Sequence, residues 1–175
     1  QNGFGARRTK AEAHACSGEW KFFFELLAIN GKQALVFWDE GTTGLTGEIL
    51  SCTEIEQRSA QGALGANNAD QKLSRFLTRF ESGGNAGAGS FGRGKLIFQA
   101  ASKKHSILID SLRIHDNQYI ALDRKVIGTQ LKQPERPYIG KDASNFIIRE
   151  TGGALKPLQK HGTRITILDV NEEII

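Results

Sequence analysis

The sequence contains no methionine, only two cysteines, three prolines, and two residues each of tryptophan and tyrosine. Cys16 and Cys52 are too few for a structural zinc site or a disulfide framework, so we expect a reducing compartment, the cytoplasm. No apolar run approaches the roughly 20 residues that a membrane-spanning helix needs, and no charged-then-apolar leader opens the chain. We therefore expect no membrane partner.

What remains is the composition of an ordinary globular domain. The chain has 175 residues, of which 39% are hydrophobic and 24% are charged. The net charge of +4, from 23 basic and 19 acidic residues, suits an anionic ligand without requiring one. No basic and aromatic surface pattern specifically supports nucleic-acid binding. Because the chain opens at Gln1 and ends on "NEEII", we expect it to be an excerpt of a longer protein.

Strand and helix patterns alternate along the chain. Residues 19–38 predict two strands joined at Asn30-Gly31, because this dipeptide between apolar runs is a strong hairpin signal. Residues 51–69 read as a loop or weak helix and residues 132–162 as irregular. The other expected elements are helices at 70–80 and from 95 onward, strands at 105–114 and 118–128, and a strand at 162–170.

The helix at 70–80 has the clearest period. Leu73, Phe76, Leu77 and Phe80 fall at i, i+3, i+4 and i+7, which places them on one apolar face, with Asp70 as the expected cap. The order of elements indicates an α/β sandwich of the α+β, two-layer type. We expect a mixed, mostly antiparallel sheet with helices on one face.

Residues 87–95, "GAGSFGRGK", fit three nucleotide-binding patterns. The dinucleotide pattern G-x-G-x-x-G needs a preceding strand and an acid about 20 residues later. A helix precedes the loop instead, and Asp110, the nearest acid, lies inside an expected strand. The phosphate-loop pattern needs Ser or Thr after Lys95, where Leu96 stands. A merely flexible loop explains the glycines but not Lys95.

The third pattern gains support from three other segments in chain order. These are "QNGFGARR" at 1–8, "DEGTTGLTG" at 39–47 and "HGTRITI" at 161–167, with "GSFGRGK" at 89–95 between the last two. Together the four segments resemble the signature boxes of the GHKL ATPases, the superfamily of gyrase, the heat-shock chaperone ATPases, histidine kinases, mismatch-repair ATPases and the MORC proteins. The resemblance spans nearly the whole chain and implies the Bergerat fold, with residues 1–175 as one ATP-binding domain.

The resemblance assigns the magnesium ligand and the catalytic general base to the first box. Asn2 would be the magnesium ligand, and a neutral amide oxygen is a reasonable partner for a hard cation already balanced by phosphate. A helix cap or chain end is the alternative role for Asn2. Gly5 replaces the usual aspartate of this box. The general-base glutamate would lie four residues before Asn2, in a first helix outside the sequence, so no catalytic residue is assigned here.

The second and fourth boxes would hold the nucleoside. Asp39 would accept a hydrogen bond from the adenine amino group, Gly41 and Gly44 would let the backbone pass under the base and ribose, and Thr163 would reach adenine through its hydroxyl. The alternatives are an Asx-type turn at Asp39 and a strand start at Thr163. The "DEGTTG" spacing is one residue longer than the commoner D-x-G-x-G.

The third box would hold the phosphates. Backbone N–H groups around Ser90, Gly92 and Gly94 would converge on the β- and γ-phosphates, helped by the start of the next helix. Arg93 and Lys95 are candidates for direct charge contacts, although a solvated loop position is the alternative for each. "ESGGNAGAG", residues 81–89, would be the lid that closes over the nucleotide.

The resemblance thus implies magnesium-dependent ATP binding and slow ATP hydrolysis that drives a conformational or dimerisation cycle. The partners would be ATP, the other domains of a longer chain and, with ATP bound, a second copy. "GSFGRGK" followed by an "AAS" helix is most similar to bacterial multi-domain members, several of them defence proteins. Two alternatives stay open: a nucleotide sensor without turnover, and the catalytic domain of a histidine kinase.

Overall fold

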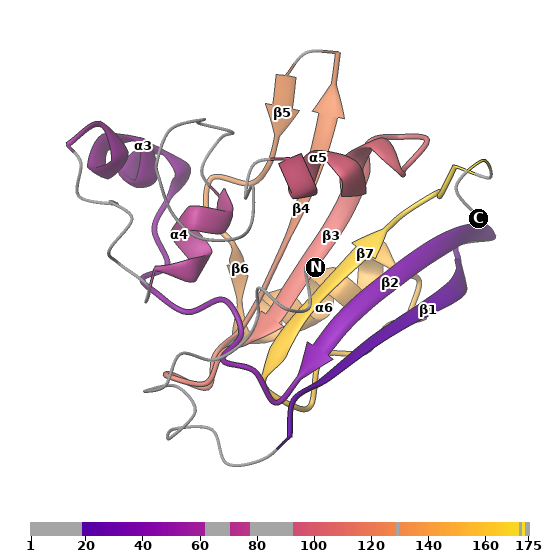
Figure 1. Cartoon of the computed structure of the whole chain (residues 1–175), viewed down its shortest axis with the longest axis horizontal. Helices are drawn as coiled ribbons and strands as arrows, with labels where there is room; N and C mark the ends of the chain where they lie inside the picture. Colours follow the sequence, from indigo (N-terminus) through magenta and orange to yellow (C-terminus); the bar gives the residue numbers. More distant parts are fainter. Residues whose placement is uncertain (1–18, 62–70, 78–92, 129, 172, 174–175) are drawn as a thin grey trace.

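The described part of the chain folds around one seven-stranded sheet (Figure 1). The strands are β1 (Lys21–Ile29), β2 (Lys32–Glu40), β3 (Ser106–Leu112), β4 (Tyr119–Ile127), β5 (Gln130–Lys132), β6 (Tyr138–Ile139) and β7 (Gly162–Ile167). The helices are α3 (Cys52–Ala60), α4 (Lys72–Leu77), α5 (Arg93–Ala100) and α6 (Gly140–Glu150). The structure is a computed structural model that describes residues 19–61, 71–77, 93–128, 130–171 and 173, with only the backbone described at 93–96.

The sheet has the order β1–β2–β7–β3–β4–β5, and β6 also pairs with β4. Every ladder between the described strands is antiparallel. The strand β7, last in the sequence, lies between β2 and β3, so that chain segments far apart in sequence become neighbours in the middle of the sheet (Figure 1). These features confirm the expected α+β class with a mostly antiparallel sheet.

The hairpin of β1 and β2 forms where the Asn-Gly signal predicts it. Asn30 and Gly31 have φ values of 50° and 74°. Both residues tolerate a positive φ, and two consecutive positive values give the turn whose twist matches the flanking strands. Residues 21–29 then pair with residues 32–40 along their whole length. The expected strands at 105–114 and 118–128 are likewise confirmed as β3 and β4.

One face of the sheet packs against α3, α4 and α5. Leu73 and Leu77 are buried as the helical period predicts, and Phe76 is partly buried beside them, whereas Asp70 and Phe80 lie outside the described residues. In the expected loop or weak helix, α3 begins after Ser51, whose side chain accepts from the backbone N–H of Glu54. Buried side chains of α3 and α4 join those of β3, β4 and β7 in one apolar cluster, and the partly buried Phe98 of α5 packs against it.

The opposite face is covered by α6, which lies behind the sheet in Figure 1, so the expectation of helices on one face holds for α3, α4 and α5 but is wrong for α6. The expectation that residues 132–162 are irregular is therefore wrong for α6, and also for the short strand β6 that precedes it. Ala143, Phe146 and Ile147 are buried at i, i+3 and i+4 and pack with residues of β2, β3 and β4. Proline and glycine on either side of this segment made its short apolar face difficult to recognise in the sequence. The helix is stabilised by tertiary packing, because its local sequence signals are weak.

Candidate functional site

The end of β2 and the start of β7 lie side by side and bring Asp39 together with Thr163. The last pair in this ladder is Trp38 with Arg164, so the next residues outward are Asp39 and Thr163. The backbone N–H of Thr163 donates to Oδ1 of Asp39 at 3.1 Å, across 124 residues of sequence. The hydroxyl of Thr42, in the loop that follows β2, donates to the same oxygen. Two of the residues expected at an adenine site are therefore neighbours.

The Asp39 carboxylate is buried, with 8% of the residue exposed. Burial raises the pKa of this carboxyl above its ordinary value, whereas the hydrogen bonds from Thr42 and Thr163 and the charge of Lys72 oppose the rise. Both of its described hydrogen bonds go to Oδ1, and no described residue donates to Oδ2. A carboxylate oxygen of a buried residue, for which the described residues supply no donor, is suited to an external donor.

The loop after β2 is held to the rest of the sheet end by its backbone. The N–H of Gly41 donates to the carbonyl of His161 at 2.9 Å. Gly44 has a φ of 69°, and a Cβ there would lie 2.6 Å from the carbonyl oxygen of Leu112. A Cβ on Gly41 would lie 2.6 Å from the carbonyl oxygen of Glu19. Close approach to the protein's own backbone thus requires both glycines; their contact with a nucleotide stays a prediction.

Two residues that the sequence did not predict for the site, Ser111 and Gly162, join the loop to β7. Ser111 of β3 donates through Oγ to the carbonyl of Gly162 at 2.7 Å and accepts the N–H of Leu45 at 2.9 Å. Its Oγ also lies 3.2 Å from Oγ1 of Thr163. A Cβ on Gly162 would overlap the carbonyl oxygen of Asp39. The "GT" pair, Gly162 and Thr163, indicated the start of this strand in the sequence. No sequence pattern indicated that Ser111 would lie at the site.

Lys72 adds a positive charge near the site. Its Nζ donates to Oγ1 of Thr43 at 2.6 Å, and its charge acts on the carboxyl of Asp39. Because Lys72 opens α4, it joins the helical face of the sheet to the loop after β2. The period of apolar residues predicts the helix to which this lysine belongs. That period gave no reason to expect Lys72 at the site.

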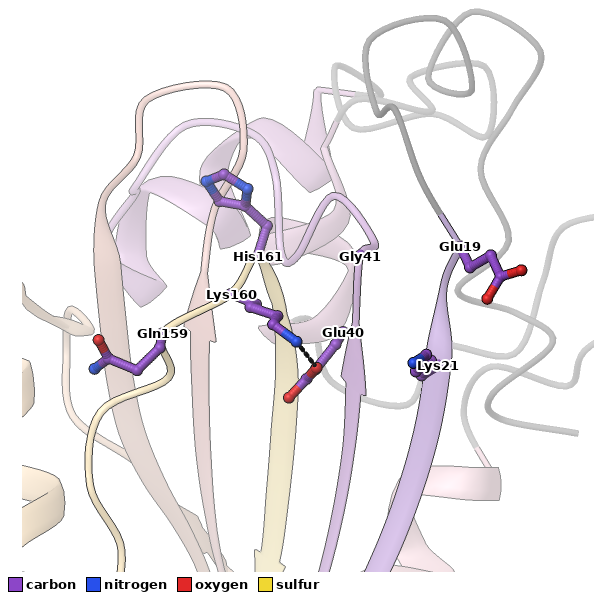
Figure 2. Close-up of a pocket in the computed structure, with 7 residues that line it drawn as sticks. All are labelled: Glu19, Lys21, Glu40, Gly41, Gln159, Lys160 and His161. Atoms are coloured by element: carbon purple, nitrogen blue, oxygen red, sulfur yellow. Dashed lines mark hydrogen bonds and ion pairs between the residues drawn. The ribbon is translucent and has the colours of Figure 1, made fainter.

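A pocket of about 510 Å³ lies beside the site, at the same end of the sheet. Figure 2 shows Glu40 of β2 ion-paired with Lys160, at 2.9 Å, and Lys21 on the neighbouring strand. The pocket is lined by chain neighbours of Asp39 and Thr163 rather than by those two residues. The full lining is Glu19, Lys21, Glu40, Gly41, Gln159, Lys160 and His161. Its charged rim suits a polar ligand group or solvent.

Asp110 is excluded as the free acid that a dinucleotide site needs. It is fully buried on the face of the sheet opposite Asp39, where it forms an ion pair with Arg164. The hydroxyl of Tyr119 donates to its Oδ2 at 2.7 Å. Since its carboxylate is fully engaged inside the protein, the dinucleotide interpretation of the glycine segment loses its ribose-binding residue.

The phosphate and metal assignments lie largely outside the described part of the chain. Asn2, Ser90 and Gly92 are not among the described residues. Arg93, Gly94 and Lys95 form the first turn of α5, which places a helix start in the glycine segment as expected, but their side chains are not described. Among the described residues there is no group of three or more His, Cys, Asp or Glu that could hold a metal ion.

The described helices include none that is both long and apolar enough to cross a membrane. The comparisons with known proteins give no further assignment: no family model and no curated protein matches the chain.

Proposed function

We propose that this chain binds ATP with magnesium and, within a longer protein, hydrolyses it slowly to drive a conformational or dimerisation cycle, as its resemblance to the GHKL ATPases implies. The observation that carries the proposal is the state of Asp39. Its carboxylate is buried, held through Oδ1 by Thr42 and Thr163, and offers Oδ2 without a described donor.

Adenine supplies the donor that this oxygen lacks. Its exocyclic amino group would donate to Oδ2 of Asp39, while guanine and hypoxanthine present a carbonyl oxygen at the same ring position and would be repelled. A site built around a buried acceptor discriminates strongly against a ligand that cannot donate to it. The hydroxyl of Thr163, next to Ser111, would orient the base from the neighbouring strand.

The assignment of residues to the triphosphate depends on the sequence resemblance. Ser90, Gly92, Gly94, Arg93 and Lys95 would surround the phosphates, and Asn2 would hold magnesium, which would neutralise phosphate charge during transfer. The start of α5 near the glycine segment supports this arrangement, since helix N-termini attract anions. No described residue is assigned to the hydrolytic step.

Calorimetric titration of the chain with magnesium and ATP tests the proposal. We expect saturable binding of ATP and at least about tenfold weaker binding of inosine triphosphate, because its ring carbonyl replaces the amino donor. Asp39→Asn should lose most of the ATP affinity. It should also reduce the preference for ATP over inosine triphosphate, since an amide donor would then face the base. Asp123→Asn, a matched change on β4, should bind ATP as wild type does.

The absence of saturable ATP binding, or an Asp39→Asn variant that binds as wild type does, would overturn the proposal. Phosphate release, measured separately on the longer parent protein, distinguishes turnover from binding alone. Binding without any phosphate release would support the nucleotide-sensor alternative and contradict the hydrolytic half of the proposal.

A further inference from the structure

The strand β1 forms one edge of the sheet and exposes large apolar side chains. Phe22, Phe24 and Leu26 are 44%, 73% and 44% exposed, and they share one face of the strand. Phe22 stacks on Phe37 of β2 with ring centroids 6.4 Å apart, so the exposed row continues the apolar surface of the sheet. No described strand pairs with the outer side of β1, and an apolar edge strand of this kind is a template for another strand.

The sequence of this edge is complementary to itself when reversed. Residues 21–25 read "KFFFE", with Lys21 and Glu25 at equal distances on either side of Phe23. These three side chains share the second face of β1, where Phe23 stacks on Trp38 with centroids 4.9 Å apart. Both charged residues are exposed, and neither forms an ion pair with a described residue.

We propose that β1 pairs antiparallel with β1 of a second copy of this chain, about a two-fold axis at Phe23, so that one sheet continues across the dimer. Lys21 of each copy then lies opposite Glu25 of the other, and the two Phe23 residues face each other between these charge pairs. On the other face, Phe22 of each copy lies opposite Phe24 of the other.

The pairing agrees with the physical rules for sheets. Opposite charges and aromatic side chains directly across an antiparallel ladder each stabilise it. A two-fold axis makes every contact occur twice, as closed dimers of identical chains require. The outer N–H and C=O groups of β1, which pair with no described strand, would gain partners in the second copy.

The interface would border the candidate nucleotide site without including its residues. Phe22 lies opposite Asp39 in the ladder of β1 and β2, and Lys21 lines the neighbouring pocket (Figure 2). The partner strand would pass along the outer side of Glu19 and Lys21. Dimerisation through β1 does not depend on ATP binding, so the two proposals can be tested separately.

Charge reversal in the chain, with its oligomeric state followed by sedimentation velocity over a range of concentrations, tests the proposal. We expect wild type to dimerise. K21E places two negative charges on β1 and E25K two positive charges, so each variant alone should dimerise at least about tenfold more weakly. An equimolar mixture of K21E and E25K should recover dimers, because each copy then meets opposite charges.

The double variant K21E/E25K should also dimerise, since exchanging the two charges preserves their complementarity. Lys132→Glu on β5, at the other edge of the sheet, and Glu56→Lys on α3 provide matched controls that should leave the dimer unchanged. A wild-type chain that stays monomeric at every concentration would overturn the proposal. Dimers that survive both single reversals unchanged would also overturn it, since they would place the interface elsewhere.

Discussion

Arg164 and Asp110 face each other across β7 and β3 as a buried ion pair joined at two points. Nε of Arg164 donates to Oδ1 of Asp110 and Nη2 donates to Oδ2, each at 2.9 Å. The guanidinium also donates to the carbonyl of Lys156 at 2.8 Å. Arg164 directly follows Thr163, so this pair fixes the strand that supplies one side of the candidate base site.

Asp110→Ala should destabilise the fold strongly. Removing the carboxylate leaves a buried guanidinium without its counter-charge, a change that costs about 3–5 kcal/mol in other buried pairs. Chemical denaturation of the variant and wild type measures this loss. Asp123→Ala, which removes a carboxylate ion-paired with Lys125 nearer solvent, should cost about 1 kcal/mol or less. Similar losses in the two variants would contradict the importance assigned to the buried pair.

Asp39→Asn should change how stability depends on pH. Because burial raises the pKa of Asp39, the folded protein holds this proton more tightly than the unfolded chain does. Its contribution to folding is therefore most favourable in acid and is lost as the pH rises from the ordinary value of 3.8 through the raised pKa. An asparagine has no such dependence.

We therefore expect the unfolding free energy of Asp39→Asn, relative to wild type, to increase as the pH rises through that window. Urea denaturation of both proteins at a series of pH values measures the difference. A difference that stays constant, or that shrinks as the pH rises, would show that the carboxyl is not held in the buried environment described here.

Gly162→Ala should disrupt the junction of β2 and β7. The added Cβ would overlap the carbonyl oxygen of Asp39, so the strands would have to separate. We expect a loss of about 3 kcal/mol or more in thermal or chemical unfolding, together with loss of nucleotide binding. Gly128→Ala is the control: its Cβ meets open space, and only its φ of 62° is unfavourable, at about 1–2 kcal/mol. Equal losses in the two variants would contradict the close approach at Gly162.

Ser111→Ala should loosen the site without removing any proposed ligand contact. It leaves the N–H of Leu45 and the carbonyl of Gly162 without their shared partner, at a cost of about 1–3 kcal/mol in unfolding free energy. ATP should bind more weakly because Thr163 loses its support. Ser144→Ala removes a hydroxyl that bonds only within α6, to Gly140, and should leave ATP affinity unchanged. Equal affinities in the two variants would exclude a positioning role for Ser111.

Local signals predicted the elements whose formation depends on local chemistry. The Asn30-Gly31 turn is one, because its backbone conformation is available to few other dipeptides. The period of Leu73 and Leu77 is another, because it places both on the same helix face. By contrast, α6 begins at Gly140 without a side-chain cap, so the sequence offered no start signal and the helix depends on its packing.

The site could be predicted only as a set of candidates. Motif resemblance selected Asp39 and Thr163, but their proximity depends on β7 entering the sheet between β2 and β3, a long-range event that no local pattern specifies. The need for glycine at 162 likewise arises only when β2 packs against it. Such requirements belong to the assembled sheet and not to any one segment.

The alternation of side chains along β7 has one further consequence. Thr163 points to the face of the sheet that carries Asp39, and Arg164 points to the face that carries Asp110. A slip of one residue in this strand would exchange them, placing an unpaired cation toward the nucleotide side and a hydroxyl opposite a buried carboxylate. The free-energy penalty of that misalignment means that the buried pair of Arg164 and Asp110 also selects the alignment in which the proposed base site exists.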